Sequence, residues 1–307
     1  MSERIEDDDE RVIVRVLVRG LVHVARQEIE AAESSVRRSR LEGDPLSPGS
    51  IRKLRIAIRR IEYQLATMGE VDPTLEVNEL VDRLHEVGKP FGQLRDAEIL
   101  SARVAKALGD RGATPEGERL LGAVAEERYL AQRASDSWLD SSTFHHMLES
   151  LNEFRLTLPS DAVSPAMARP VAQQAIRATW RSVKRAAKEA KVDSGDEALH
   201  ALRRAVKHSV YLTRAFSYVL GPSSEEFVLR LVALQKLLGR QHDHVIVAIW
   251  LEEAGDDVAS LKPLAHDVSL VERQRAANDA EQWTRHWQSV RDLHPKETVM
   301  TTYSFFS

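Results

Sequence analysis

The chain has 307 residues, and 43 lysines and arginines against 47 aspartates and glutamates give a formal net charge of −4 at pH 7. This length suits one large domain or two smaller ones, and the near-balanced charge means that any site for a polyanion must come from local segregation of charge. The absence of cysteine excludes disulfides, thiol nucleophiles and thiolate metal sites. Because no apolar run approaches the roughly 18 residues that a membrane span needs, we expect a cytoplasmic protein that does not enter the membrane.

The N-terminal segment 1–10 is acidic and lacks the basic and apolar parts of a signal peptide, so we expect a flexible end. After it, apolar positions recur at helical spacing, and glycine, at 14 residues, is scarce. We expect a first series of helices over 11–40, 50–68, 75–91, 96–108, 115–139 and 142–154.

A break follows at 157–170, where three prolines stand among serine and aspartate. Proline inside a helix removes a hydrogen bond and clashes with the preceding turn, so we expect a linker here. A second series of helices is expected over 171–191, 196–218, 223–238, 243–254 and 261–290. We therefore expect an acidic N-terminus at 1–10, a first bundle at 11–156 and a linker at 157–170. A second bundle at 171–293 and a tail at 294–307 follow.

The two helical series are related by an internal repeat. The stretch around Arg55 aligns with the stretch around Arg203, 148 positions later. The stretch around Gly92 aligns with that around Gly239, at an offset of 147. Because two separate matches keep nearly one offset, they indicate a duplication. The predicted fold is therefore all-α, with two homologous antiparallel bundles.

A basic stripe follows the repeated helix in both halves, at the spacing i, i+3, i+7 and about a third of a turn from the apolar stripe. Its members are Arg52, Arg55 and Arg59 in the first half and His200, Arg203 and Lys207 in the second, beside the apolar stripe Ile51, Leu54, Ile58, Ile61 and Leu65. Cations on one helix face repel each other, and few carboxylates stand at partner spacing in these helices. The stripes therefore favour a shared polyanion site over two solvated faces.

These residues resemble the two signatures of the CHAD family, the conserved-histidine α-helical domain. The first, close to His-x-x-Arg-(Val/Ile)-x-x-(Arg/Lys)-Arg, is present at 52–60 and again at 200–208. The second, Leu-Gly-x-x-Arg-Asp, is present at 91–96 and at 238–243. Four instances in the same order extend the resemblance over nearly the whole chain, from about residue 11 to 293.

The resemblance implies two four-helix bundles, related by a pseudo-two-fold axis, around a basic central cavity or pore that binds inorganic polyphosphate. It implies no catalysis, cofactor or metal, and it adds polyphosphate granules to the expected locations in the cytoplasm. The chain departs from the signatures at Arg52, which stands in place of histidine, and at His242, which stands in place of arginine. The candidate binding residues are Arg55, Arg59, Arg203 and Lys207 at the centre, with Arg19, Arg26, Arg52, Arg60, Arg95, Arg177, Arg181, His200, Arg214 and His242 around them.

Two other functions stay open at this point. A nucleic acid could use the same basic groove, although aromatic residues make up only 6% of the chain and base stacking needs them. A metal-dependent phosphohydrolase could use the pair His242 and Asp243, but Arg95 and Asp96 fill that place in the first half, and arginine is a poor metal ligand. Asp96 and Asp243 follow glycines, so we expect each to cap the N-terminus of a helix. No protein partner or oligomeric state is indicated.

Overall fold

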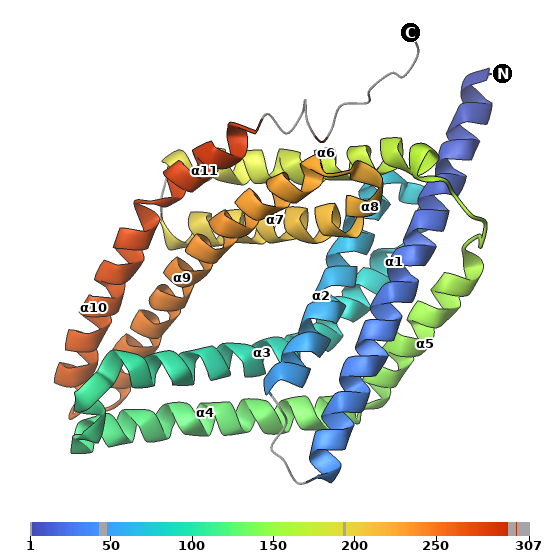
Figure 1. The fold of residues 1–307 in the computed structure, drawn as a ribbon. Helices are drawn as coiled ribbons and strands as arrows, with labels where there is room; N and C mark the ends of the chain where they lie inside the picture. The colour runs from blue at the N-terminus through green and yellow to red at the C-terminus, as the bar shows by residue number, and fades with distance from the viewer. Residues whose placement is uncertain (1, 43–47, 193–194, 294–298, 300–307) are drawn as a thin grey trace.

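The computed structural model describes residues 2–42, 48–192, 195–293 and 299. Within these ranges the chain forms helices and no strand, which confirms the all-α prediction (Figure 1). The first half contains α1 (Ser2–Leu41), α2 (Pro48–Val71), η1 (Pro73–Leu75), α3 (Asn78–Leu108), η2 (Gly109–Ala113), α4 (Pro115–Leu139) and α5 (Ser142–Thr157). The second half contains α6 (Pro165–Val192), α7 (Asp196–Ala215), α8 (Ser217–Leu220), α9 (Ser223–Asp257), α10 (Lys262–Ala280) and α11 (Trp283–Arg291). None of these helices combines the length and the apolar character that crossing a membrane requires.

Two helices begin earlier than their patterns indicated. α1 starts at Ser2, so the acidic residues expected as a flexible end belong to its first turns, where the helix dipole favours negative charge. α6 starts at Pro165, because a proline at the first position of a helix lacks only an N–H that would have no helical partner anyway. The hydroxyl of Ser164 accepts a hydrogen bond from the N–H of Met167 at 3.4 Å. The expected tail at 294–307 lies outside the described residues, apart from Val299.

α3 and α9 run straight through the places where breaks were expected, after Phe91 and after Leu238. A glycine inside a helix costs about 1 kcal/mol relative to alanine. Burial offsets this cost, since Phe91 and Leu238 are both at most 1% exposed. Conversely, the single helix expected over 261–290 is divided into α10 and α11 by the turn at Glu281 and Gln282.

The helices pack in the same succession in both halves. α1 packs on α2, α2 on α3 and α3 on α4, and α6, α7, α9 and α10 follow the same order. The packing uses the apolar stripe predicted for α2, because all five of its members are buried to 1% exposure or less. One continuous apolar core contains residues from both halves, so the two halves are in direct contact over part of their length.

The two halves touch at two separate places (Figure 1). At the α2–α7 contact, α2 packs on α6 and α7, and the ring centroids of Tyr63 and His208 are 3.6 Å apart. At the tip contact, the far ends of α3 and α4 meet the far ends of α9 and α10. Val104, Leu251 and Leu261 belong to the apolar cluster buried there. The helices therefore form a closed frame whose inner sides are α2, α3, α7 and α9.

Polar bonds surround the apolar cluster of the tip contact. Arg103 on α3 donates to the Asp243 carboxylate on α9 at 2.8 Å. The indole N–H of Trp250 on α9 donates to Glu127 on α4 at 2.5 Å. Because these partners come from opposite halves, they fix the register in which the two ends meet.

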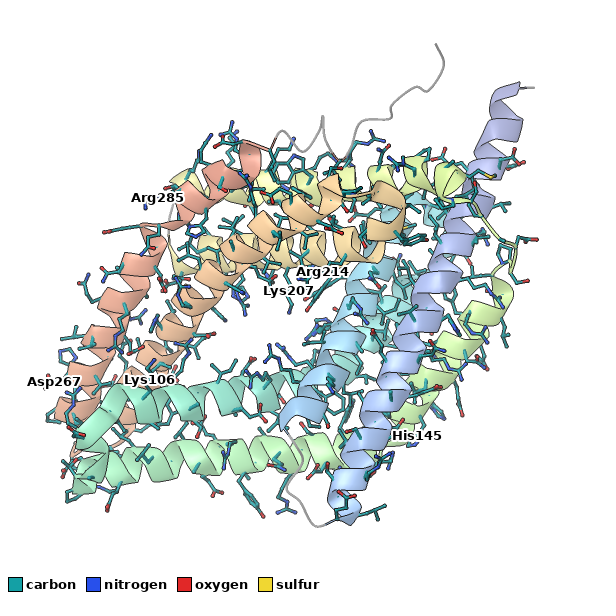
Figure 2. The ribbon with its side chains drawn as sticks, in the orientation of Figure 1. Lys106, His145, Lys207, Arg214, Asp267 and Arg285 are labelled. Carbon is teal, nitrogen blue, oxygen red and sulfur yellow. The ribbon has the colours of Figure 1, made fainter. Side chains whose placement is uncertain are left out.

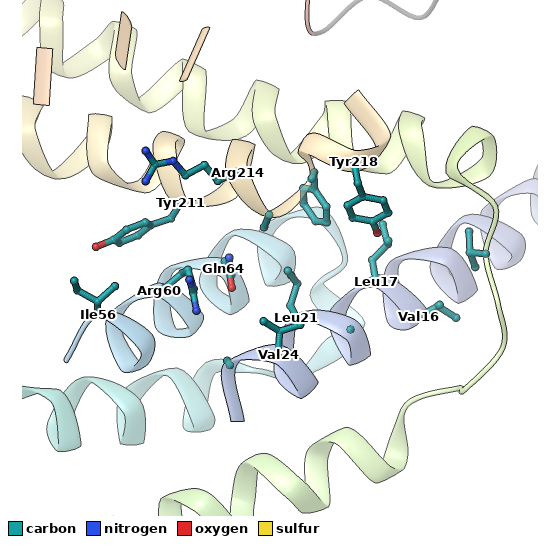
Figure 3. Close-up of a pocket in the computed structure, with 15 residues that line it drawn as sticks. Val16, Leu17, Leu21, Val24, Ile56, Arg60, Gln64, Tyr211, Arg214 and Tyr218 are labelled. Carbon is teal, nitrogen blue, oxygen red and sulfur yellow. The ribbon is translucent and has the colours of Figure 1, made fainter. Parts of the chain in front are cut away.

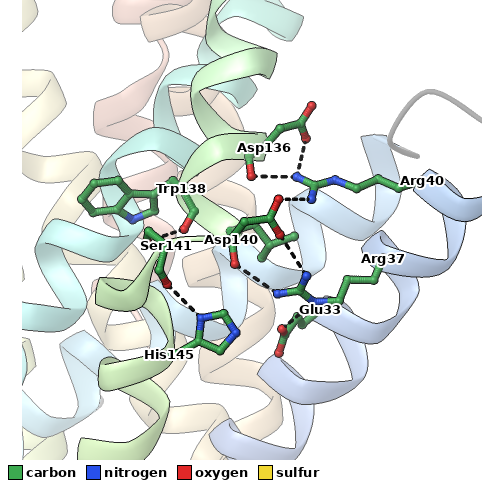
Figure 4. A network of polar contacts seen from close by, with 9 residues as sticks. Glu33, Arg37, Arg40, Asp136, Trp138, Asp140, Ser141 and His145 are labelled. Carbon is green, nitrogen blue, oxygen red and sulfur yellow. Dashed lines mark hydrogen bonds and ion pairs between the residues drawn. The ribbon is translucent and has the colours of Figure 1, made fainter.

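The C-terminal end of α1 is fixed to the turn between α4 and α5 (Figure 4). Arg40 bonds both the carboxylate and the carbonyl of Asp136, at 2.9 and 2.8 Å. Arg37 and Arg40 each bond one oxygen of the Asp140 carboxylate at 2.9 Å. At the start of α5, the hydroxyl of Ser141 accepts the N–H of Phe144 at 3.2 Å. This network fixes the position of the C-terminal end of α1.

We predict that Leu251→Ala lowers the free energy of unfolding by about 2–5 kcal/mol, because Leu251 is fully buried in the tip contact and its truncation opens a cavity. Leu229→Ala is the matched control on the same helix, since Leu229 is 63% exposed, and it should change that free energy by less than about 0.5 kcal/mol. Urea denaturation followed by circular dichroism measures both. Equal losses for the two variants would contradict the packing of α9 described above.

Candidate polyanion-binding site

The two basic stripes come together where α2 and α7 face each other. We call Arg55 and Arg59 from α2 and Arg203 and Lys207 from α7 the central cluster. Burial, followed by the charges of the three arginines, lowers the pKa of Lys207 from 10.5 to about 7. Figure 2 shows Lys207 on the side of α7 that faces the space within the frame. The cluster therefore holds several cations close enough to oppose one another.

The signature glycines lie beside the arginines of the cluster, at a distance where an added Cβ atom would be in ordinary van der Waals contact with them. A Cβ atom on Gly92 of α3 would lie 4.0 Å from Nε of Arg55, and one on Gly239 of α9 would lie 3.8 Å from Nε of Arg203. With no side chain at either glycine, each guanidinium lies against the neighbouring helix. The same arrangement of glycine and arginine occurs in both halves.

Asp96 and Asp243 face arginines and cap no helix. The N-cap prediction is wrong, because α3 and α9 are continuous at these positions. Asp96 lies 4.0 Å from Arg55, and Asp243 lies 2.8 Å from Arg103. Burial raises the pKa of Asp96, against the opposing effects of Arg55, Arg203 and Lys207. Its carboxylate is open to solvent on one side, so it is an accessible anion beside the cluster.

Carboxylates neutralise the central cluster only in part. Arg59 bonds Glu62 at 2.9 Å, and Arg55 has the more distant Asp96. In the described part of the chain, no carboxylate lies within 4.0 Å of Arg203 or Lys207, and Nε of Arg55 is buried without a hydrogen-bond partner. The cluster can therefore accept further negative charge at the places where these donors point.

Two histidines lie beside the cluster in the second half. Nδ1 of His200 and Nδ1 of His242 are 3.2 Å apart, so one ring donates to the other. Burial and the nearby Arg203 lower the pKa of His242 to about 4, and burial also lowers the pKa of His200. His242 is thus neutral at pH 7 and adds a hydrogen-bonding group where the family signature has a cation. Because it faces His200, its neighbour Asp243 is left to pair with Arg103.

The other predicted binding residues lie outside the central cluster. Arg52 is exposed near the start of α2, and Arg95 bonds Glu98 at 3.0 Å. Arg19 donates to the carbonyl oxygens of Arg155 and Leu158 at 2.8 and 2.6 Å, where α5 ends. These bonds tie α1 to the C-terminal end of α5.

The remaining predicted cations are distributed over four helices, α1, α2, α6 and α7. Arg26 bonds Glu30 and Asn152, and Arg60 forms an ion pair with Glu28 of α1. On α6, Arg177 is half-buried and Arg181 is exposed, and Arg214 is exposed on α7. None of these five arginines is among the main charges that lower the pKa of Lys207.

Two tyrosines belong to the site and were missed from the sequence. The rings of Tyr63 on α2 and Tyr211 on α7 stack with centroids 6.2 Å apart. The ammonium of Lys207 lies 5.6 Å from the Tyr211 ring. The signal was present, because Tyr211 follows Tyr63 by 148 positions, the offset that relates Arg55 to Arg203.

No group of three or more histidines, aspartates or glutamates that could hold a metal ion occurs within the described ranges. His242 and Asp243, the pair considered for metal chemistry, turn to different partners, His200 and Arg103.

A profile of the CHAD domain matches residues 21–252. Two uncharacterized proteins of Mycobacterium tuberculosis, from strains CDC 1551 / Oshkosh and H37Rv, are each 28% identical to the chain over 252 residues. The match covers 75% of this chain and 47% of theirs, so the chain spans about half the length of these curated relatives.

Two solved structures have a similar fold. The CHAD domain from the plant Ricinus communis gives a TM-score of 0.67 at 19% identity, over 92% of this chain and 91% of that one. PptA from Streptomyces chartreusis gives 0.71 at 18% identity, over 91% of this chain and 99% of that one. At these identities the likeness establishes the fold alone.

We predict that the protein loses stability as the pH falls from 6.5 toward 4. Burial lowers the pKa of His208 and of His242 from 6.5 to about 4, so the unfolded chain binds protons in this range that the folded protein does not. His208→Phe, which keeps a ring against Tyr63, should weaken the dependence of the free energy of unfolding on pH. Urea denaturation at several pH values measures it, with the exposed His146→Phe as the control. The same pH slope in His208→Phe and the unaltered protein would contradict the prediction.

Proposed function

Because this chain belongs to the CHAD family, we propose that it binds inorganic polyphosphate through the central cluster. The observation that carries the proposal is the crowding of Arg55, Arg203 and Lys207 with too few carboxylates to neutralise them. Polyphosphate carries about one negative charge per internal phosphate, so a short stretch of it could contact all of these cations. The planar guanidinium donates two hydrogen bonds to non-bridging oxygens, and the lysine adds a point charge.

We infer further that the two halves are duplicated bundles related by a pseudo-two-fold axis through the α2–α7 contact. An isologous contact brings equivalent residues face to face. Tyr63 stacks on its equivalent Tyr211, and the charge of Arg203 acts on its equivalent Arg55. On this proposal the space within the frame is a basic cavity, with ligand contacts contributed by both halves.

The proposed role is binding without catalysis and without a cofactor. Arg52, Arg95, His200 and His242 occupy signature positions around the central cluster and would extend the contact along the polymer. The remaining predicted arginines, on α1, α6 and the outer sides of α2 and α7, would contribute longer-range attraction. We propose that the protein acts in the cytoplasm, including at polyphosphate granules.

We predict that Arg55→Ala combined with Arg203→Ala lowers the affinity for long-chain polyphosphate about 100-fold or more, since each lost contact is a charged hydrogen bond. The slope of log affinity against log salt should also fall by about 1–2, because fewer phosphates are contacted. Fluorescence anisotropy with end-labelled polyphosphate at two or more salt concentrations measures both quantities.

The matched control is Arg133→Ala combined with Arg285→Ala, two exposed arginines on α4 and α11 that remove the same net charge. It should change the affinity less than about threefold. RNA and orthophosphate, at equal phosphate concentration, serve as competitors. Preferential binding of RNA, equal losses in the two double variants, or release of orthophosphate from the polymer would each contradict the proposed function.

We predict that polyphosphate binding takes up a proton at pH 8. The pKa of Lys207 is about 7 in the free protein, and a bound polyanion raises it because the charged ammonium becomes favourable. The affinity should therefore be greatest below pH 7 and fall as the pH rises above it, by at most about tenfold per unit. Calorimetry at pH 8 in two buffers of different ionisation enthalpy counts the proton.

Lys207→Arg tests this assignment, because it keeps the positive charge and removes the titration. Because arginine does not titrate in this range, the affinity of the variant for polyphosphate should stay constant between pH 7 and 9. Binding of polyphosphate to it should take up no proton at pH 8. Proton uptake that persists in Lys207→Arg would assign the titration to another group and contradict the prediction.

A further inference from the structure

We propose that the hollow between α1, α2, α7 and α8 is a second ligand site, for a small molecule with an apolar body and an anionic head. The hollow has a volume of about 590 Å³, within the range of about 300–1,000 Å³ that small-molecule sites occupy. It lies on the outer side of the α2–α7 contact, where α1 faces α7 (Figure 3).

One side of the hollow is apolar. Leu17, Leu21 and Val24 of α1 line it, and Figure 3 shows them along one helix face opposite α7. Val24 lines the hollow and is 50% exposed, so its apolar surface is available to a ligand. Gly20 lies in the same face, and a Cβ atom there would meet nothing within 4 Å. This side would bury an alkyl chain or an aromatic ring.

The opposite side carries polar groups from α2 and α7. Gln64 is 3% exposed and lines the hollow, and its amide makes no hydrogen bond to another described residue. The amide is therefore available as a hydrogen-bonding group for a ligand in the hollow. Arg214 and Tyr211 also line the hollow, and Figure 3 shows both side chains extending toward the end that is far from Leu17. Neither the guanidinium nor the hydroxyl has a hydrogen-bond or ion-pair contact with the described residues, so both are open to a ligand head at that end.

The charge of this side selects an anionic head. Arg60 and Arg214 both line the hollow, but Arg60 is paired with Glu28 of α1, which lines a neighbouring hollow, so Arg214 supplies the unpaired positive charge. No carboxylate lines the hollow itself in the described part of the chain. A carboxylate or phosphate could accept from Arg214, Tyr211 and the Gln64 amide, while its apolar tail lies along α1.

The test uses four ten-carbon probes below their micelle concentrations: decanoate, decyl phosphate, decanol and decyltrimethylammonium. We expect calorimetry to detect both anions, with decanol at least tenfold weaker and the cation not bound. The stronger of the two anions identifies the head group. Arg214→Ala should weaken the anions about tenfold and leave decanol unchanged. Equal binding of decanol and the anions would overturn the proposal, because it would show unspecific apolar contact.

Two further variants separate the site from the fold and from polyphosphate binding. Gly20→Phe adds a ring where open space is available, so it should abolish binding of the anions while polyphosphate affinity and melting temperature are retained. Gln64→Leu should weaken binding of the anions, because it removes a hydrogen-bonding group from the lining of the hollow. Unaltered anion binding in Gly20→Phe, or no binding of any probe to the unaltered protein, would overturn the proposal. The latter result would mean that the hollow is closed or filled by the chain itself.

Discussion

The structure depends on holding like charges together at the contact between its two halves. Arg55 on α2 and Arg203 on α7 repel each other, and burial together with these charges lowers the pKa of Lys207 beside them. The same two helices carry apolar stripes, and side chains such as Leu54 and Leu202 are fully buried. Because the basic and apolar stripes are about a third of a turn apart on each helix, burying one fixes the direction of the other. Core packing thus stabilises a cluster that electrostatics alone would separate.

The sequence predicted the environment of a side chain correctly where that environment depends on the residue's own helix. Helical periodicity predicted the buried stripe of α2, and the repeat identified Arg55 and Arg203 as equivalent positions. The sequence was less informative where the contacts of a side chain depend on the neighbouring helix. Arg19 and Arg26 have the spacing of a basic stripe, but their partners are the carbonyls at the end of α5 and the side chain of Asn152. Nothing in the residues of α1 alone indicates that α5 lies beside them.

Tertiary burial also overrode local signals that looked strong. Glycine in α3 and α9 favours a break, yet both helices continue through Gly92 and Gly239 because neighbouring side chains such as Phe91 and Leu238 are buried. His242 suggested a cation, and burial makes it neutral at pH 7. The hollow beside Gln64 is formed by segments far apart in the sequence, so no local pattern could reveal it. These features follow from the fold and could be derived only after it was known.

The second contact between the halves has a mechanical consequence. If α2 and α7 were the only connection, the halves could swing apart there and relieve the repulsion among the arginines. The apolar cluster at the far ends of α3, α4, α9 and α10 prevents this, because a swing about one contact would pull the other open. The repulsion is therefore kept as strain in a rigid scaffold. On the proposed function, binding an anion would relieve that strain without rearranging the backbone, so the cluster would be preorganised for its ligand.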